Sequence, residues 1–149
     1  MALLRRLRLQ IVLVGLWLGG LAAVGLIGAP TAFALIPDRL AAAAVASRMF
    51  HVMSLAAAVL GALLLIVERQ RSSGMTTPLL LVMGGLFFDV IGEFVIVPQL
   101  LAAATAHAAG AGGWHVAAST AYAGQALCVF AYAWSLPSQL GRDPAARAA

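Results

Sequence analysis

Four ionisable side chains lie within stretches of the sequence that are otherwise apolar. Arg48 and His51 are three residues apart, and Asp89 and Glu93 are four apart. On a helix, residues at these separations lie on the same face. An ionisable group inside a membrane is costly unless it is paired, so each of the four is a candidate for binding a ligand or an ion.

A third set of polar side chains lies near the C-terminus. His115, Ser119, Tyr122 and Gln125 follow one another at separations of four, three and three residues. That spacing predicts one polar stripe along a helix. We therefore add His115, Ser119 and Tyr122 to the candidate residues for binding a ligand or an ion.

The chemistry that these residue types favour is cation binding. These stretches contain two carboxylates but one arginine, and this surplus of negative charge favours a metal ion, a proton or a small cation. His51, Asp89, Glu93 and His115 are also the ligand types that suit a hard or borderline metal ion. The sequence lacks the spacings of di-iron bundles and of common zinc motifs, so the cofactor stays open. A redox protein holding a metal, or haem between His51 and His115, is an alternative.

A structural interpretation competes with the functional one, because polar contacts between helices often do no more than set the register of a bundle. The second and third apolar stretches are expected to run antiparallel, so residues at equal depth lie side by side. Depths counted at about 1.5 Å per residue predict that Arg48 pairs with Glu93 and that His51 pairs with Asp89.

The composition of the 149 residues excludes a soluble fold. Hydrophobic residues make up 63% of the chain and charged residues 9%, whereas a soluble domain is roughly half apolar and a quarter charged. The net charge of +4 does not indicate nucleic-acid binding, because the basic residues lie beside apolar stretches. The sequence has no nucleotide-binding loop or nucleophile elbow, so we expect no enzymatic activity.

Four apolar stretches are long enough to cross about 30 Å of hydrocarbon. They cover residues 9–29, 40–67, 78–97 and 114–136. We predict an all-α integral membrane four-helix bundle that forms one transmembrane domain over residues 1–149. Residues 99–109 are expected either to prolong the third helix or to lie on the outer membrane surface.

The arginines predict the orientation, since short cytoplasmic loops hold the excess of positive charge. All nine basic residues are arginines, and seven of them flank the apolar stretches on one side: Arg5, Arg6, Arg8, Arg69, Arg71, Arg142 and Arg147. Both termini are therefore expected in the cytoplasm. The arginine and alanine content is typical of a GC-rich bacterial genome, so we expect a multi-pass protein of the bacterial inner membrane, inert in its cytoplasmic half and functional in its outer half.

Gly15 and Gly19 form a GxxxG pair in the first apolar stretch. Such small residues let helices approach closely in a membrane. They predict packing inside the bundle or contact between copies of the chain. An accessory or assembly subunit of a membrane complex is thus a further alternative to a cation-binding protein.

Several short runs resemble the transmembrane protein 205-like family of small four-helix membrane proteins. They are Gly15-Leu16-Trp17-Leu18-Gly19-Gly20, Ala29-Pro30 with Phe33, residues 46–50, Val97-Pro98-Gln99, and His115 with Ser119. The resemblance implies a fold and a membrane location more than an activity, because the bacterial members are largely of unknown function. A relative linked to resistance to platinum compounds implies metal or cation handling, with His115 and Ser119 as site positions.

Overall fold

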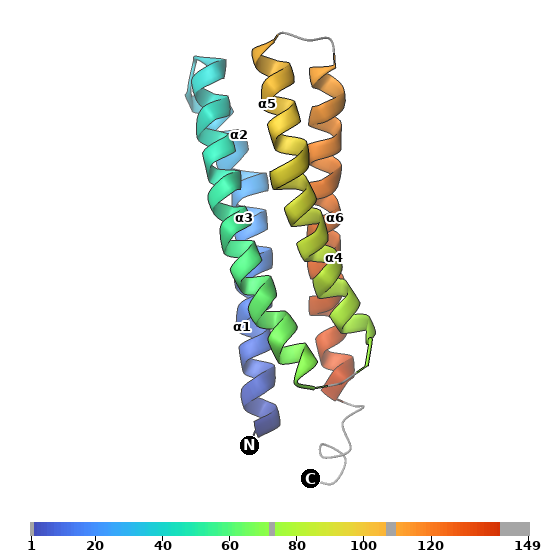
Figure 1. The fold of residues 1–149 in the computed structure, drawn as a ribbon. Helices are drawn as coiled ribbons and strands as arrows, with labels where there is room; N and C mark the ends of the chain where they lie inside the picture. The colour runs from blue at the N-terminus through green and yellow to red at the C-terminus, as the bar shows by residue number, and fades with distance from the viewer. Residues whose placement is uncertain (1, 72–73, 107–109, 141–149) are drawn as a thin grey trace.

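The computed structural model describes residues 2–71, 74–106 and 110–140, and these form helices joined by short turns (Figure 1). The first rod consists of α1 (Ala2–Ala22), η1 (Ala23–Gly28) and α2 (Ala29–Leu35). The second is α3 (Arg39–Arg69). The third consists of α4 (Thr77–Ile91), η2 (Gly92–Ile96) and α5 (Val97–Thr105), and the fourth is α6 (Ala111–Leu140).

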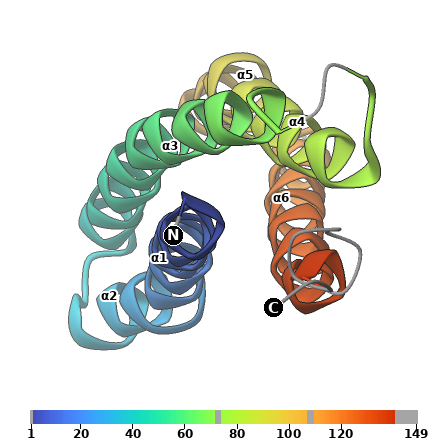
Figure 2. The ribbon, with the colours of Figure 1, turned by 90° about the horizontal axis from the view of Figure 1, so that it is seen from below.

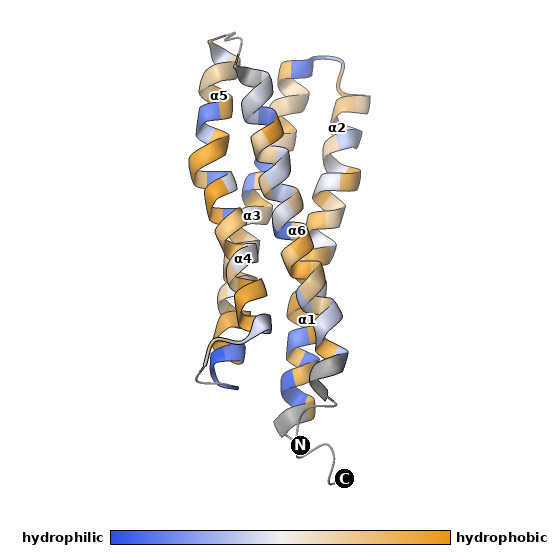
Figure 3. Ribbon diagram, turned by 90° about the vertical axis from the view of Figure 1, so that its right-hand side faces the viewer, coloured by the Kyte–Doolittle hydropathy of each residue, from blue (hydrophilic) through white to orange (hydrophobic). Residues whose placement is uncertain are grey.

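Each rod is long and apolar enough to cross a membrane. The candidate spans are Leu4–Leu35, Arg39–Arg69, Thr77–Thr105 and Gly112–Pro137. Many of their large hydrophobic side chains are exposed, and Figure 3 shows hydrophobic residues along all four rods. Leu40, for example, is 82% exposed and Trp134 is 77% exposed. Such a surface suits lipid, so the four helices indicate a multi-pass membrane protein.

Polar side chains set the starts of two rods. Asp38 caps α3, since its Oδ1 accepts a hydrogen bond from the Leu40 N–H at 2.9 Å. Thr76 caps α4 in the same way, with its Oγ1 3.4 Å from the Leu79 N–H. Both caps satisfy N–H groups that the first helical turn leaves without a backbone partner.

The first helix continues past Pro30, where we expected it to end, and the third continues past Pro98 to Thr105, which was one of the two expectations for residues 99–109. Each continuation begins with a π-helical turn, η1 before Pro30 and η2 before Pro98. A proline cannot bond the carbonyl four residues earlier, and its ring clashes with that carbonyl. In both helices that carbonyl belongs to the π turn, at Leu26 and at Phe94. The wider turn accommodates the ring, so the chain stays helical to Leu35 and Thr105.

The rods pack as two hairpins. In the first, α1 and α2 lie against α3; in the second, α4 and α5 lie against α6. The hairpins join along α1 with α6 and α3 with α4. Figure 1 shows the α2 and α3 pair separating from the α5 and α6 pair at the end of the bundle away from the N-terminus. In the view from below in Figure 2, the helices are arranged in an arc. The helices α3 and α4 lie on the outside of this arc, and α1 and α6 lie on its inner side.

Trp17 occupies the centre of the bundle and is 1% exposed. Its ring lies over two glycines on neighbouring helices. A Cβ atom at Gly61 would lie 2.8 Å from Trp17 Cη2, and one at Gly85 would lie 3.2 Å from the same atom. Any larger side chain would meet the ring at these points. Val82, Val129 and Leu64 complete the apolar centre around it.

Candidate functional site

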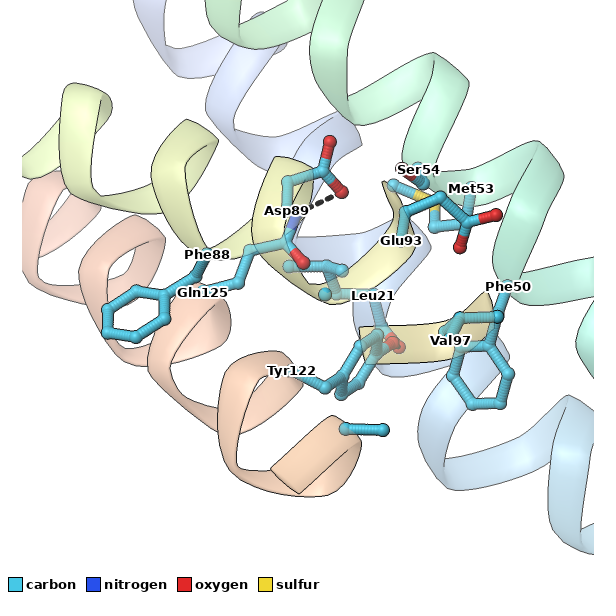
Figure 4. Close-up of a pocket in the computed structure, with 12 residues that line it drawn as sticks. Leu21, Phe50, Met53, Ser54, Phe88, Asp89, Glu93, Val97, Tyr122 and Gln125 are labelled. Atoms are coloured by element: carbon cyan, nitrogen blue, oxygen red, sulfur yellow. Dashed lines mark hydrogen bonds between the residues drawn. The ribbon is translucent and has the colours of Figure 1, made fainter. Parts of the chain in front are cut away.

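A small cavity lies between α3, the junction of α4 with η2, and α6. Its volume is about 60 Å³, which is room for one or two water molecules at roughly 30 Å³ each. Apolar side chains such as Phe50 and Phe88 form most of its wall. Polar side chains from the three helices converge on it (Figure 4): Ser54, Asp89, Glu93, Tyr122 and Gln125. We call it the Asp89 cavity.

Asp89 is 4% exposed, and only one of its carboxylate oxygens has a partner among the described residues. Its Oδ1 accepts a hydrogen bond from Gln125 Nε2 at 3.0 Å. Its Oδ2 is buried and makes no hydrogen bond of acceptable geometry, and neither does the Oγ of Ser54, which lines the same cavity and lies close enough to interact with the Asp89 carboxylate. Buried polar atoms are normally hydrogen-bonded. These two atoms therefore mark a place where a further polar species would be stabilised.

Glu93 lies in the π turn η2, four residues beyond Asp89. Its Oε1 is 2.5 Å from Nδ1 of His51 on α3. The His51 side chain is 37% exposed and the Glu93 side chain 12%. This pair therefore connects the wall of the Asp89 cavity with the surface of the bundle.

The two pairs that we expected from equal depths are wrong. His51 contacts Glu93 instead of Asp89, and the partner of Asp89 is Gln125 on α6. The packing of α4 against α3 is therefore shifted by about one helical turn from the register that we predicted from depths alone. Depths counted from the ends of apolar stretches fail here because both helices extend beyond those ends.

Arg48 lies on another face of α3. It is exposed, and it makes no ion pair within the part of the chain that the structure describes. It borders an apolar groove that includes Val24 of η1 together with Val45 and Val52 of α3. Arg48 thus does not line the Asp89 cavity.

Tyr122 joins the fourth helix to the first π turn. Its hydroxyl donates a hydrogen bond to the backbone oxygen of Leu21 at 2.5 Å, and its ring meets Phe50 edge to face. Leu21 comes two residues before η1. Tyr122 therefore lines the cavity and also helps to hold the irregular turn of the first helix.

His115 and Ser119 lie on the same helix as Tyr122, but both are exposed. His115 is seven residues from Tyr122, or about 10 Å along α6. Among the described residues, no three His, Cys, Asp or Glu side chains gather closely enough to hold a metal ion. The metal set of His51, Asp89, Glu93 and His115 is thus not brought together, and of its members His51 and Glu93 are in contact.

A second buried polar cluster, which was not predicted from the sequence, lies at the other end of the bundle. Gln10 Nε2 donates to Glu68 Oε1 at 2.7 Å, and the Tyr132 hydroxyl donates to the same oxygen at 2.8 Å. The three side chains are 6%, 2% and 1% exposed, respectively. We call them the Glu68 cluster. Arg71, in the turn after α3, lies close enough to act electrostatically on Tyr132.

Glu68 was missed because it comes one residue after the apolar stretch 40–67, where we expected a solvated loop. The helix in fact continues to Arg69. The sequence did contain one indication of this cluster. Gln10 is a polar residue at the second position of the first apolar stretch. The half of the bundle that we expected to be inert therefore holds a buried carboxylate that accepts two hydrogen bonds.

Gly15 and Gly19 do not pack inside the bundle. Both are exposed, and no atom lies within 4 Å of a Cβ built at either position. The close helix contacts are made by other glycines, such as Gly61 and Gly85 under Trp17. Contact between copies of the chain through Gly15 and Gly19 stays a prediction.

Comparison with protein families finds that residues 12–109 match the model described as Domain of unknown function (DUF4149). No curated protein and no solved structure matches the chain. The matched region begins within α1, includes the rest of the first three rods and ends before α6, which supplies Tyr122, Gln125 and Tyr132. The finer resemblance to the transmembrane protein 205-like family stays a prediction.

Proposed function

The chain belongs to the DUF4149 family, whose function is unknown, and we propose that it is a membrane protein that binds a proton or a small monovalent cation at Asp89. The single observation that carries the proposal is the pair of unpartnered buried oxygens, Asp89 Oδ2 and Ser54 Oγ, on one cavity. A buried carboxylate oxygen without a donor is stabilised by a positive charge. The proposed function is binding and not catalysis.

The charge and the number of the free ligands favour a proton over a divalent metal ion. Glu93 Oε1 is in contact with His51, and Asp89 Oδ1 is held by Gln125. Asp89 Oδ2 and Ser54 Oγ are the fully buried oxygens of the cavity that have no partner among the described residues. One carboxylate balances one positive charge, and calcium and magnesium ions take about six or more oxygen ligands, whereas a proton needs one.

The contact between His51 and Glu93 offers a route to the cavity. An imidazole can accept a proton on one nitrogen and release one from the other, which suits it to proton transfer. Since His51 is partly exposed and Glu93 lines the cavity, the pair connects the surface with Asp89. We propose that a proton reaches Asp89 by this route.

We place the protein in the bacterial cytoplasmic membrane with both termini inside, as the arginines favour. In this orientation the Asp89 cavity lies in the outer half of the membrane and the Glu68 cluster lies near the cytoplasm. The route through His51 then opens toward the outer side.

The test uses the full chain in lipid nanodiscs with two probes. Radioactive sodium ions report cation binding, and the infrared carboxyl band followed against pH reports proton binding. We expect the parent chain to give one of these signals, and Asp89→Asn to weaken it about tenfold or more. Asn retains the size of Asp and an oxygen for Gln125, so the fold is expected to survive.

The matched control is Asp38→Asn, which makes the same chemical change at an exposed helix cap. An asparagine caps helices as well as aspartate does, so this variant should bind like the parent. If Asp89→Asn gives the parent's sodium binding and the parent's carboxyl band, the proposal is wrong.

A second candidate function, an assembly subunit of a membrane complex, is favoured by the exposed Gly15 and Gly19. Their open surface is free for another helix. The double change Gly15→Leu with Gly19→Leu should then dissociate a complex isolated in mild detergent. The same assembly before and after the change would contradict this function.

A further inference from the structure

Arg48 is an exposed charge within a span of apolar residues. It lies nine residues from Arg39, or about 14 Å along α3. No carboxylate among the described residues pairs with it. A charged side chain in hydrocarbon is costly unless it reaches a polar partner, so its environment calls for an anion from outside the chain.

The groove beside Arg48 is apolar. Its walls are Val24 of the first helix and five α3 residues, Val45, Met49, Val52, Met53 and Ala56. Its volume is about 480 Å³, within the roughly 300 to 1,000 Å³ usual for small-ligand sites. The groove residues that come after Arg48 in the sequence, from Met49 to Ala56, extend about two helical turns along α3 toward the middle of the bundle.

Arg48 lies near one end of the groove. Val45 lies on its N-terminal side along α3, and the other α3 residues of the lining lie on its C-terminal side. Side chains on a helix tend to point toward its N-terminal end, which for α3 is the end at Asp38, so most of the groove lies on the side away from the direction that this tendency gives the guanidinium. A cation above an apolar groove is complementary to a phosphate above an acyl chain.

The position of Arg48 along the helix agrees with this arrangement. Arg48 and Glu68 are 20 residues apart on α3, or about 30 Å. That length equals the thickness of the hydrocarbon layer. With the Glu68 cluster placed at one boundary of this layer, Arg48 comes near the other, and its long side chain can reach the phosphates of the lipids.

We propose that Arg48 and this groove bind one phospholipid molecule. The guanidinium holds the phosphate through two parallel hydrogen bonds, a geometry that arginine provides and lysine does not. One acyl chain follows Val52 and Ala56. The site is separate from the Asp89 cavity, and the proposal does not depend on cation binding there.

The experiment measures the lipid that remains on the protein. The full chain is placed in nanodiscs of equal parts phosphatidylglycerol and phosphatidylcholine, extracted in mild detergent and weighed by native mass spectrometry. We expect one retained phospholipid on the parent chain. Arg48→Gln should lower its retention about tenfold, as the loss of a charged hydrogen bond predicts.

Two further variants separate the charge from the groove. Ala56→Trp fills the groove and leaves Arg48 in place, and it should also release the lipid. Arg39→Gln is the matched control, since it removes another exposed arginine of the same helix, and it should retain the lipid. Arg48→Lys should bind more weakly than the parent because lysine lacks the paired hydrogen bonds.

Two outcomes would overturn the proposal. In the first, Arg48→Gln retains as much lipid as Arg39→Gln, which would show that the guanidinium holds no phosphate. In the second, the parent is a dimer without retained lipid and Ala56→Trp makes it monomeric, which would show that the groove is covered by a second copy. Circular dichroism of each variant checks that the helices are intact.

Discussion

At the Arg69 end of the bundle, Glu68 receives hydrogen bonds from two other helices on a single oxygen. Toward the opposite end, Asp89 receives one, and its second oxygen faces a cavity with no partner among the described residues. Both carboxylates are almost fully buried. The two carboxylates are therefore alike in burial and differ in the number of hydrogen bonds that the surrounding helices supply, and on this difference we base our proposal that Asp89 binds a cation.

The two ends also differ in backbone. The Glu68 cluster is supported by regular helix, whereas both π turns, η1 and η2, lie beside the Asp89 cavity or its tyrosine. π-helical turns are rare in proteins as a whole, but those that occur are often found at functional sites. Trp17 fills the apolar space between the two regions. We therefore expect changes near Glu68 to affect stability and changes near Asp89 to affect binding.

The largest effect should come from Trp17, which separates the two regions. Trp17→Ala leaves a large hole over Gly61 and Gly85 and should lower the free energy of unfolding by about 4 kcal/mol. Trp134→Ala is the matched control, because Trp134 is 77% exposed and should cost less than about 1 kcal/mol. Unfolding in a series of detergent mixtures measures both. Equal losses would show that Trp17 does not hold the centre.

The same chemical change at the two carboxylates tests the comparison directly. Glu68→Gln weakens two hydrogen bonds to a charged group and should cost about 2 kcal/mol of unfolding free energy. Asp89→Asn removes a charge that is incompletely satisfied, so it should change stability by less than about 1 kcal/mol. The detergent unfolding assay compares them. A larger loss for Asp89→Asn would reverse the roles that we assign to the two regions.

The smallest effects should come from the two tyrosine hydroxyls. Tyr132→Phe removes a hydrogen bond to the Glu68 carboxylate and should cost about 1.5 kcal/mol. Tyr122→Phe removes a hydrogen bond to a neutral backbone oxygen, that of Leu21, and should cost about 0.5 to 1 kcal/mol. The two variants differ from the parent by one oxygen each. The comparison weakens if the order of the two losses is reversed.

Much of the fold was predictable because the signal for it is local. An apolar run of sufficient length predicts a membrane-crossing helix whatever its neighbours are, and all four runs were found this way. The ends of the helices were less predictable. Pro30 was expected to end the first helix, and the course of the chain after Pro98 was left open, but π turns accommodate both rings and both helices continue.

The site was predictable in its members and not in its contacts. His51, Asp89, Glu93 and Tyr122 were selected because polar groups in apolar runs are costly, and three of them line one cavity. Arg48 satisfied the same criterion but faces an apolar groove on another side of α3. The Glu68 cluster was missed because its glutamate lies one residue past an apolar run.

The sequence alone determined that this chain forms four helices with a few buried charges, since hydrophobicity and helix length add up residue by residue along the chain. Only the tertiary structure decided which of those charges meet. Helix rotation and register depend on contacts between segments far apart in sequence. The most important of these is the packing of the Trp17 ring against Gly61 and Gly85. A shift of one turn between α3 and α4 is enough to bring His51 to Glu93 and to leave one oxygen of Asp89 facing the cavity.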